Sequence, residues 1–491
     1  MNKMVINHLD KLFVTSDTST IISELEVQHP AARMVVLAAQ AQQQEVGDGT
    51  NLVVSLAGDL LANAADLVKE GLQPLEVGRG YQAAAQMALD HLTTLIHPGS
   101  EGIDLRHQDT VATRLKASIS TKQFGFEDVL APLVAQACIS VLGKNAKSFN
   151  VDNVRVCKLV GGTLHNSSVV KGLVIPRSAE GAVTGVEDAK VVVYAQGVEA
   201  NMTETKGTVL IKDAEQLMNY AKSEEAAMEK VIASIAASGV KLVVSGSAVS
   251  EIALHFFDKH GIMCLRINSK FELRRICRAT GAVALVKFEA PRPDDLGFAK
   301  ECSLEEMGGM LCTVLRQDQA MGSIATVVLR GPTQQILDDA ERAVDDGVNS
   351  YRILGKDART VPAGGCTEIQ LSKYLTQKAT ETVGLDQYAI LKFAEALEVV
   401  PRVLAENSGH SATDVVARLH AASEANAGLN LVTGQAEDLQ KTRGVVDLFL
   451  TKWWAIKLAG DAVATVLKVD QIIMSKPAGG PKARAPGGDD D

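Results

Sequence analysis

A seven-residue loop, Glu45 to Asn51, carries the residues whose types and spacing best suit chemistry. Gly47 and Gly49 permit backbone angles that other residues resist, and a helical pattern begins near Thr50. Unpaired N–H groups at a helix start bind anions such as phosphate. Asp48 would repel a bare phosphate, so a carboxylate here indicates that Mg²⁺ bridges the two charges. The loop predicts a Mg-nucleotide site, although G-D-G is also common in plain turns.

Helices must position this loop on both sides. From Pro30 to Gly71 two helical patterns flank it, with Gly71 as the expected end of the second. More helix is predicted through about Leu142. The apolar stripe of the second helix contains Leu52, Val53, Leu56, Leu60, Ala64, Leu67 and Val68.

The character of the chain changes near Val154, where short β-rich runs predict a second domain with strands at 156–159, 169–175 and 190–194. A long helical pattern follows at 213–237. Strands at 241–244, 262–267 and 283–286 then alternate with helices at 249–260 and 270–280. This βαβαβ order predicts a parallel sheet with right-handed crossovers.

Helical character returns after Thr333 and continues from Thr367 to Met474. The sheet domain is therefore read as an insertion, and we expect the two helical ends of the chain to pack together. The polar tail from Lys476 to Asp491 is rich in Pro and Gly and is expected to be flexible.

Composition limits the function classes. The 491 residues are enough for several domains, and the net charge of -10 without a basic run argues against a nucleic-acid surface. Seven cysteines without C-x-x-C spacing fit reduced thiols and argue against structural zinc. No signal peptide is recognised in Met1 to Phe13, and no apolar stretch is expected to reach membrane-spanning length. A cytoplasmic protein is predicted.

Five sequence segments together resemble one family, the group II chaperonin subunits. They are 2–5 (Asn-Lys-Met-Val), 25–32 (Leu-Glu-Val-Gln-His-Pro-Ala-Ala), the E-V-G-D-G-T loop, 339–347 and 469–474. The resemblance covers nearly the whole chain and implies a multi-domain α/β chaperonin fold. It implies a mostly α-helical equatorial domain (1–106 and 365–475), a small α/β intermediate domain (107–174 and 326–364), an inserted α/β apical domain with a helical lid protrusion (175–325) and a flexible tail (476–491).

The resemblance also implies roles for single residues in an ATP site. Asp48 matches the magnesium ligand, and Asp17 lies beside the γ-phosphate. Asp346 matches the catalytic aspartate, which orients or deprotonates the attacking water once the intermediate domain closes. Lys122 matches a lysine of the nucleotide-sensing loop. The implied phosphate, nucleoside and ribose contacts are Gly47, Gly49, Thr50, Asn51, Gly364, Gly365 and Asp447.

Two of these residues have simpler explanations on their own. Asp346 lies off the apolar stripe of its helix and four residues after Arg342, so a surface ion pair would explain it. Lys122 could be an ordinary solvated lysine.

The chain also departs from the family pattern. Thr18 and Ala363 stand where the family has glycine, and Asn51 stands where it has a second threonine. Each difference is expected to slow or weaken turnover. The family's N-terminal helix and Gly-Pro-x-Gly phosphate turn do not precede Asn2, so we expect a segment before Met1.

By the same resemblance, the segment around Lys206 to Lys230 forms the lid and the helix from Phe271 to Ala279 lines the substrate groove. Arg274, Arg275 and Arg278 give this helix a basic face that could select acidic client segments. The alternative is that these charges only solvate the outer face of a crossover helix.

The leading interpretation is an ATPase that uses Mg²⁺ and ATP to close a double-ring chamber around non-native polypeptides, of the actin and tubulin class by resemblance. Its partners would be seven paralogous subunits, with no nucleic acid and no membrane. Two alternatives remain. One is a structural ring subunit with little turnover, which Thr18, Asn51 and the missing N-terminal turn favour and which the intact Asp48 and Asp346 oppose. The other is a free-standing phosphotransferase.

Overall fold

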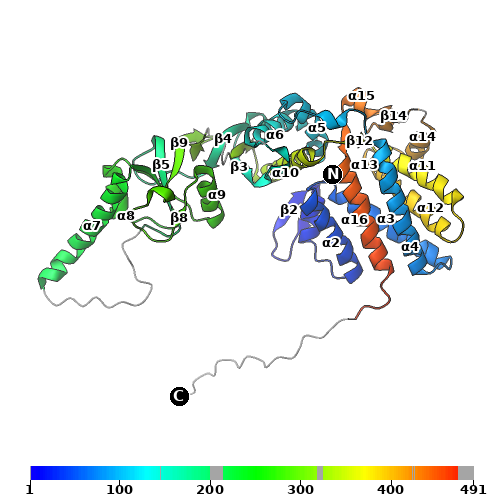
Figure 1. The fold of residues 1–491 in the computed structure, drawn as a ribbon, viewed down its shortest axis with the longest axis horizontal. Helices are drawn as coiled ribbons and strands as arrows, with labels where there is room; N and C mark the ends of the chain where they lie inside the picture. Colours follow the sequence, from blue (N-terminus) through cyan, green and yellow to red (C-terminus); the bar gives the residue numbers. More distant parts are fainter. Residues whose placement is uncertain are drawn as a thin grey trace, which may run out of the picture.

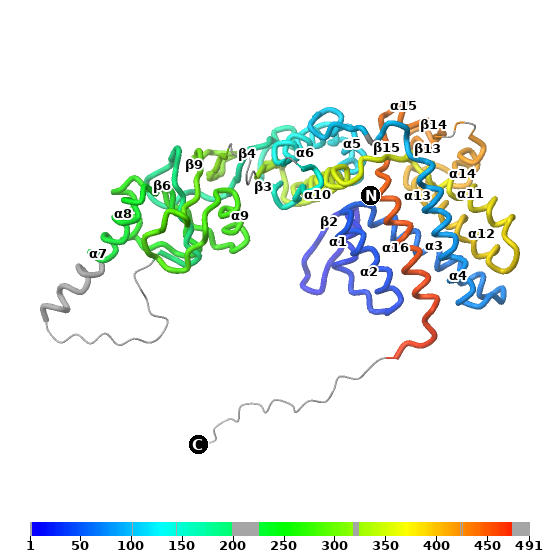
Figure 2. Tube along the Cα trace, viewed as in Figure 1, coloured from blue at the N-terminus to red at the C-terminus, as the bar shows by residue number. Residues whose placement is uncertain are grey.

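The computed structural model describes residues 2–143, 145–198, 214–317, 324–422, 424 and 426–473, without the side chains of Glu101 and 214–224. The described chain is elongated, with a helical part at one end, a middle part and a sheet-rich part at the other end (Figure 1). The chain leaves the helical part, builds the middle and sheet-rich parts, and returns (Figure 2). The predicted tail at 476–491 lies outside the described residues.

Helices from both ends of the chain share one hydrophobic core, as predicted. Helix α3 (Thr50–Lys69) and helix α4 (Pro74–Leu92) pack against α12 (Asp386–Leu397) and α16 (Phe449–Leu467). Small residues permit this close packing, since a Cβ on Gly80 would lie 2.4 Å from Ala389 Cβ. The Tyr81 hydroxyl donates to the Leu60 carbonyl oxygen at 3.1 Å, which satisfies a polar group inside this core.

One expectation about α3 is wrong. By length and composition this helix is long and apolar enough to cross a membrane, whereas no stretch of that length was expected from the sequence. Most of its predicted stripe packs in the core, where Val53, Leu56 and Leu60 are almost inaccessible. Val68, the last residue of that stripe, is instead 38% exposed. The core helix of a soluble protein passes the same test of length and hydropathy, so this finding is weak evidence for a membrane span.

Shorter elements complete the helical part. The region from Thr367 to Met474 was read as helical throughout, but short strands interrupt it. The elements are β1 (Lys3–Ile6), β2 (Leu12–Thr15), α1 (Thr18–Glu24), α2 (Pro30–Glu45), β12 (Thr360–Pro362), α11 (Cys366–Glu381), α13 (Val399–Asn407), α14 (Ala412–Ala421), β13 (Ala427–Leu429), β14 (Ala436–Asp438), α15 (Leu439–Arg443) and β15 (Val446–Leu448). Strand β12 pairs antiparallel with β15, which places Val361 opposite Asp447.

The middle part packs three helices on one end of a sheet. Helices α5 (Gln108–Ser120), α6 (Glu127–Val141) and α10 (Gln334–Lys356) share a core with strands β3 (Val154–Val160) and β11 (Ala325–Gly331). Helix α10 begins where predicted and lies close to α5, because Gly347 leaves room for Ile119. Strands β3 and β11 are parallel.

The sheet continues into the sheet-rich part through β4 (Ser168–Ile175). The first half of β4 pairs with β11 and its second half pairs with β10 (Met310–Arg316). The order is β3-β11-β4-β10-β9-β5-β6-β7, with β8 also paired to β5. The further strands are β5 (Gly185–Tyr194), β6 (Val240–Ser245), β7 (Met263–Arg266), β8 (Ala284–Leu285) and β9 (Gly297–Met307).

The predicted βαβαβ unit is confirmed: β6, α8 (Glu251–Lys259), β7, α9 (Lys270–Thr280) and β8 follow one another along the chain. Strands β6 and β7 pair in parallel, whereas β8 pairs in parallel with β5, the other neighbour of β6. Helix α7 (Ala214–Ala237) comes directly before β6. Alternate residues of β5 face two cores, one with α9 and one with α7 and α8. Residues 206–213 of the predicted lid lie outside the described chain; the rest of it falls in α7.

Candidate functional site

The loop between α2 and α3 has the backbone that its glycines predicted. Gly47 and Gly49 have φ angles of +80° and +76°, in the left-handed region. A Cβ on Gly47 would also lie 2.3 Å from Cγ of Asn349 in α10. The loop therefore needs glycine both for its turn and for the close approach of the middle part.

The start of α3 suits an anion. Gly49 is the N-cap and offers no side-chain hydrogen bond to the first turn, which also contains no acidic residue. Thr50 is buried, and its hydroxyl donates to Oε1 of Gln43 at 2.8 Å. Asn51 is exposed on the same turn.

Hydrogen bonds hold Asp48 directly before the N-cap of α3. The Gly49 N–H donates to Asp48 Oδ1 at 2.7 Å, and the Gln42 amide donates to the Asp48 carbonyl oxygen at 2.9 Å. Burial nevertheless raises the pKa of the Asp48 carboxyl. A divalent cation beside it would favour the charged form, so the residues present fit a Mg²⁺ ion shared with phosphate oxygens. Among the described residues, no cluster of three His, Cys, Asp or Glu side chains could hold a metal alone.

Lys122 joins two carboxylates that come from different parts of the molecule. Its ammonium lies 2.6 Å from Asp17 Oδ1 and 2.8 Å from Asp346 Oδ2. Lys122 follows α5 and Asp346 lies on α10, both in the middle part, whereas Asp17 caps the N-terminus of α1 in the helical part. All three side chains are about nine-tenths buried, with relative accessibilities of 10% for Lys122, 11% for Asp17 and 6% for Asp346.

The two carboxyl groups differ in their titration. Burial raises the pKa of Asp17, but the Lys122 ammonium and the hydroxyl and N–H of Thr20 outweigh it and hold that pKa below its usual value. Burial raises the pKa of Asp346 to about 8, with Lys122 acting against the shift and the charges of Asp48 and Asp17 adding to it. A carboxyl group of this kind can exchange a proton near neutral pH.

Both simpler explanations for these residues are wrong. Arg342 pairs with Asp339 at 2.9 Å, and Asp346 is 4% exposed rather than a surface residue. Lys122 is buried between two carboxylates rather than solvated. The apolar stripe of α10 wrongly suggested that residues off the stripe are exposed. In the structure α5 and the segment after it also cover a second, polar side of the helix.

The glycines before α11 have left-handed backbones but pack against protein. Gly364 and Gly365 have φ angles of +69° and +79°. A Cβ on Gly364 would lie 2.4 Å from Leu439 Cδ1, and one on Gly365 would lie 2.8 Å from Pro401 Cβ. These contacts explain the glycines by themselves, so the implied approach of the backbone to a nucleoside stays a prediction.

Asp447 sits in a buried ionic cluster that sequence reasoning missed. Lys452, in the first turn of α16, pairs with Asp447 Oδ2 at 3.0 Å and with Glu368 of α11. The charge of Asp447 contributes to the raised pKa of Asp48, so both carboxylates lie within electrostatic reach. A lone lysine in the first, otherwise uncharged turn of an apolar helix was the signal that could have indicated this cluster.

The predicted substrate residues lie apart from this cluster, on α9 in the sheet-rich part (Figure 1). Phe271 is 69% exposed, and Arg274 and Arg278 are exposed beside it. Arg275 is half-buried and lies within electrostatic range of Arg155 on β3. None of the three arginines forms an ion pair with another described residue, so both interpretations of this face remain open.

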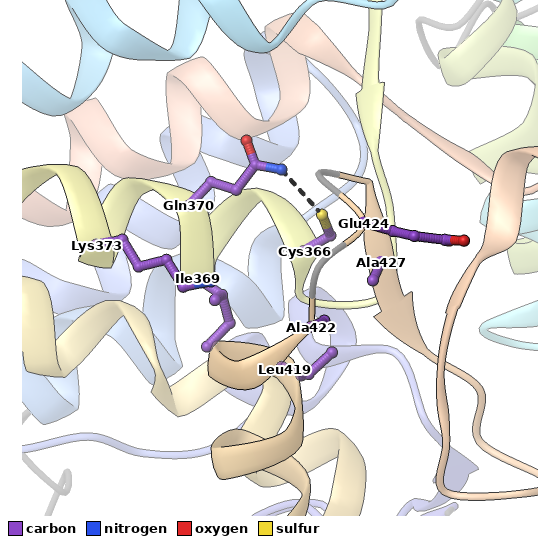
Figure 3. Close-up of a pocket in the computed structure, with 8 residues that line it drawn as sticks. All are labelled: Cys366, Ile369, Gln370, Lys373, Leu419, Ala422, Glu424 and Ala427. Carbon is purple, nitrogen blue, oxygen red and sulfur yellow. Dashed lines mark hydrogen bonds between the residues drawn. The ribbon is translucent and has the colours of Figure 1, made fainter.

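Two cavities near the helical part contain none of the predicted nucleotide residues. One, of about 80 Å³, lies at the start of α11, where the Gln370 amide contacts Cys366 Sγ (Figure 3). It is smaller than ordinary ligand pockets, and burial raises the pKa of the Cys366 thiol to about 12, which leaves the thiol protonated. The other, of about 360 Å³, lies between α5 and α15 and is lined by Asp109, Thr110, Thr113, Arg114, Gln440, Gly444 and Val446.

Known proteins are similar to this chain over nearly its whole length. The TCP-1/cpn60 chaperonin family matches residues 1–477. A protein of Arabidopsis thaliana named T-complex protein 1 subunit theta is 53% identical over 488 residues, which cover 99% of this chain and 89% of that protein. Proteins of the same name from Homo sapiens and Dictyostelium discoideum are 48% and 47% identical, over 98% of this chain and 88% and 90% of their own lengths. The resemblance drawn from the motifs is confirmed.

Proposed function

This chain belongs to the TCP-1/cpn60 chaperonin family, and we propose that it is a subunit that binds and hydrolyses Mg-ATP to close a double-ring folding chamber. The family and the mixed helix-and-sheet architecture support the chaperonin role. The observation that carries the ATPase proposal is the contact of Lys122 with both Asp17 and Asp346 beside the Asp48 loop.

Nucleotide binding is assigned to the loop and the start of α3. The N–H groups of Thr50 and Asn51 would donate to phosphate oxygens, and Gly47 and Gly49 give the loop the left-handed backbone that places these groups. Asp48 would hold Mg²⁺, which when bound neutralises phosphate charge. Gly364, Gly365 and Asp447 are assigned to the nucleoside side.

Hydrolysis is assigned to Asp346 and Lys122. The Asp346 carboxylate would accept a hydrogen bond from the attacking water and orient it. Phosphoryl transfer is catalysed mainly by such positioning and by charge stabilisation, so few other side-chain functions are needed. A phosphate group competing with Asp17 and Asp346 for the Lys122 ammonium would loosen the present ion pairs. Asp17 would then face the γ-phosphate side of the site.

Because these residues come from two parts of the molecule, nucleotide in the site would bias their relative position. We assign the parts as the equatorial (1–106 and 365–475), intermediate (107–174 and 326–364) and apical (175–325) domains. Closure of the intermediate domain would bring Asp346 into place and move the lid.

The substrate, assembly and compartment are proposed on the same basis. Phe271 and the arginines of α9 would bind exposed segments of non-native polypeptides, including those of actin and tubulin class. Seven paralogous subunits would complete each ring. The seven cysteines are all free thiols, which suits the reducing cytoplasm.

The test is ATP turnover by the full-length chain with Asp346→Asn. This change keeps the side-chain shape but removes the carboxylate, and we expect turnover to fall by about 100-fold or more with ATP binding retained. The matched control is Asp338→Asn, the same substitution on the same helix at an ion pair with Lys158. Turnover of the Asp346→Asn chain equal to that of the control would contradict the proposal.

A second candidate is a structural ring subunit that binds nucleotide without turning it over. It is favoured by Asn51, which presents an amide where the family has a hydroxyl, and by Thr18. It predicts measurable Mg-ATP binding by the unaltered chain and no difference in turnover between the Asp346→Asn and Asp338→Asn chains.

A further inference from the structure

A second buried lysine, Lys452, joins two carboxylates within electrostatic range of the Asp48 loop. The Lys452 side chain is 10% exposed, and its ammonium contacts Glu368, which is 3% exposed, and Asp447, which is 29% exposed. In the part of the chain that the structure describes, Lys452 is the only ion-pair partner of either carboxylate. The position of Asp447 therefore depends on this lysine.

The three residues come from three elements that meet around one strand pair. Asp447 lies on β15, which pairs with β12, and the chain runs from β12 through Gly364 and Gly365 into the first turn of α11, where Glu368 lies. Lys452 lies in the first turn of α16, directly after β15. The lysine thus ties the strand with Asp447 to the helix that follows the two glycines.

The two carboxylates that Lys452 joins differ in burial and in hydrogen bonding. Glu368 Oε2 is buried and has no hydrogen-bond partner, so Glu368 relies on Lys452 for its charge. Asp447 is the more exposed carboxylate and contacts Lys452 only through Oδ2. The arrangement anchors the ammonium at Glu368 and turns Asp447 outward with a fixed orientation.

We propose that Lys452 is a positioning residue for nucleoside recognition: it orients the Asp447 carboxylate so that the site selects nucleotides with a ribose hydroxyl. This inference rests on the proposed function. A carboxylate that accepts a hydrogen bond from a hydroxyl discriminates against the analogue without that hydroxyl only if its oxygen is held in place.

The test compares binding of Mg-ATP and Mg-2′,3′-dideoxy-ATP to the full-length chain by calorimetry. The unaltered chain is expected to bind ATP about tenfold more tightly. Lys452→Met alone would leave Glu368 as an unpaired buried charge, so Lys452→Met is combined with Glu368→Gln. In this double variant the ratio of the two dissociation constants is expected to fall below about threefold, with binding of Mg-tripolyphosphate unchanged.

Lys457→Met is the matched control, because it removes a lysine of the same helix that pairs with Asp461 and not with Asp447, so the tenfold ratio is expected to remain. Glu368→Gln alone keeps the contact between Lys452 and Asp447 but loses the anchor of the ammonium, so its ratio is expected to lie between those of the unaltered chain and the double variant. A purely structural role for Lys452 would weaken ATP, dideoxy-ATP and tripolyphosphate alike in the double variant. That result, or an unchanged ratio, would overturn the inference.

The outcomes separate this inference from the proposed function. Binding of ATP by the unaltered chain without ribose discrimination would overturn the inference alone, whereas no binding of ATP would overturn both. Thermal denaturation checks that the double variant folds. If it does not fold, Lys452→Leu with Glu368→Leu tests the same loss of discrimination, because two apolar side chains can fill the buried site without an unpaired charge and neither can donate to Asp447.

Discussion

At the scale of single residues, the site depends on how one cation is shared. Lys122 contacts Asp17 and Asp346, but the pKa of Asp17 is lowered while burial raises that of Asp346 to about 8. The two carboxyl groups share one ion-pair partner, but their different environments shift their pKa values in opposite directions. This is the arrangement expected where one carboxylate stays ionised and another handles a proton near neutral pH.

A pH dependence follows from this difference. If ionised Asp346 orients the water, kcat/KM of the full-length chain should fall as pH decreases below about 8, the region where the free carboxyl becomes protonated. Because the Lys122 ammonium lowers the pKa of Asp346, Lys122→Met should move this limb to higher pH.

The measurement is ATP turnover from pH 6 to pH 9.5. Lys158→Met, which removes a lysine that pairs with Asp338 and Glu341 on the same helix, is the control and should leave the limb in place. A limb that Lys122→Met leaves unmoved would rule out this electrostatic coupling.

The roles of single residues could be predicted from the sequence only where the residue lies in a recognisable motif. The motifs led to Asp17, Asp48, Lys122 and Asp346, and the structure brings these four within electrostatic range. Lys452 was missed because its partner Glu368 is distant along the chain.

At the scale of elements, the G-D-G loop joins the end of α2 to the start of α3 under the approach of α10. Gly47 meets Asn349 of α10, and the Gln42 amide of α2 reaches both the loop and the Thr451 carbonyl oxygen of α16. Three helices therefore fix the position of one short loop.

We predict that Gly47→Ala weakens Mg-ATP binding by about tenfold or more. An alanine at φ of +80° costs about 1 kcal/mol, and its Cβ would collide with Asn349. The control is Gly58→Ala on the exposed side of α3, where the added Cβ would meet no neighbouring atom within 4 Å. This change should leave Mg-ATP binding unchanged and stabilise the helix slightly. Calorimetric titration and thermal denaturation measure both effects, and equal binding by the two variants would contradict the prediction.

Elements with a clear period were predicted well, and short ones were not. The stripe of α3 and the alternation from β6 to β8 were recognised because apolar residues recur regularly. The antiparallel pair β9 and β10 was missed, although Gly308 and Gly309 between them, with φ of +71° and +78°, carry a hairpin signal. Strands β12 to β15 have three residues each, too few to show a period.

At the scale of the whole molecule, the proposed nucleotide site and helix α9 lie in different parts (Figure 1). The sheet connects them, because β4 pairs with β11 of the middle part and with β10 of the sheet-rich part. A change at Asp346 on α10 can thus reach the outer strands through packed elements.

The basic face of α9 provides a test of client binding. Reversal of charge at the exposed residues Arg274 and Arg278 to Glu should reduce crosslinking of acidic client segments to this subunit by severalfold at low salt. The control reverses Lys230 and Lys287, exposed residues of the same part, with the same change in net charge. Unchanged crosslinking of the α9 variant would support the alternative that the arginines only solvate the helix.

The most direct measurement is the mass and shape of the native particle that contains this chain, isolated through a tag and imaged with and without Mg-ATP. We predict a double ring of paralogous subunits that closes when Mg-ATP is added. A monomer or small oligomer that does not change shape with ATP would contradict the central claim that this chain is a subunit of a nucleotide-driven folding chamber.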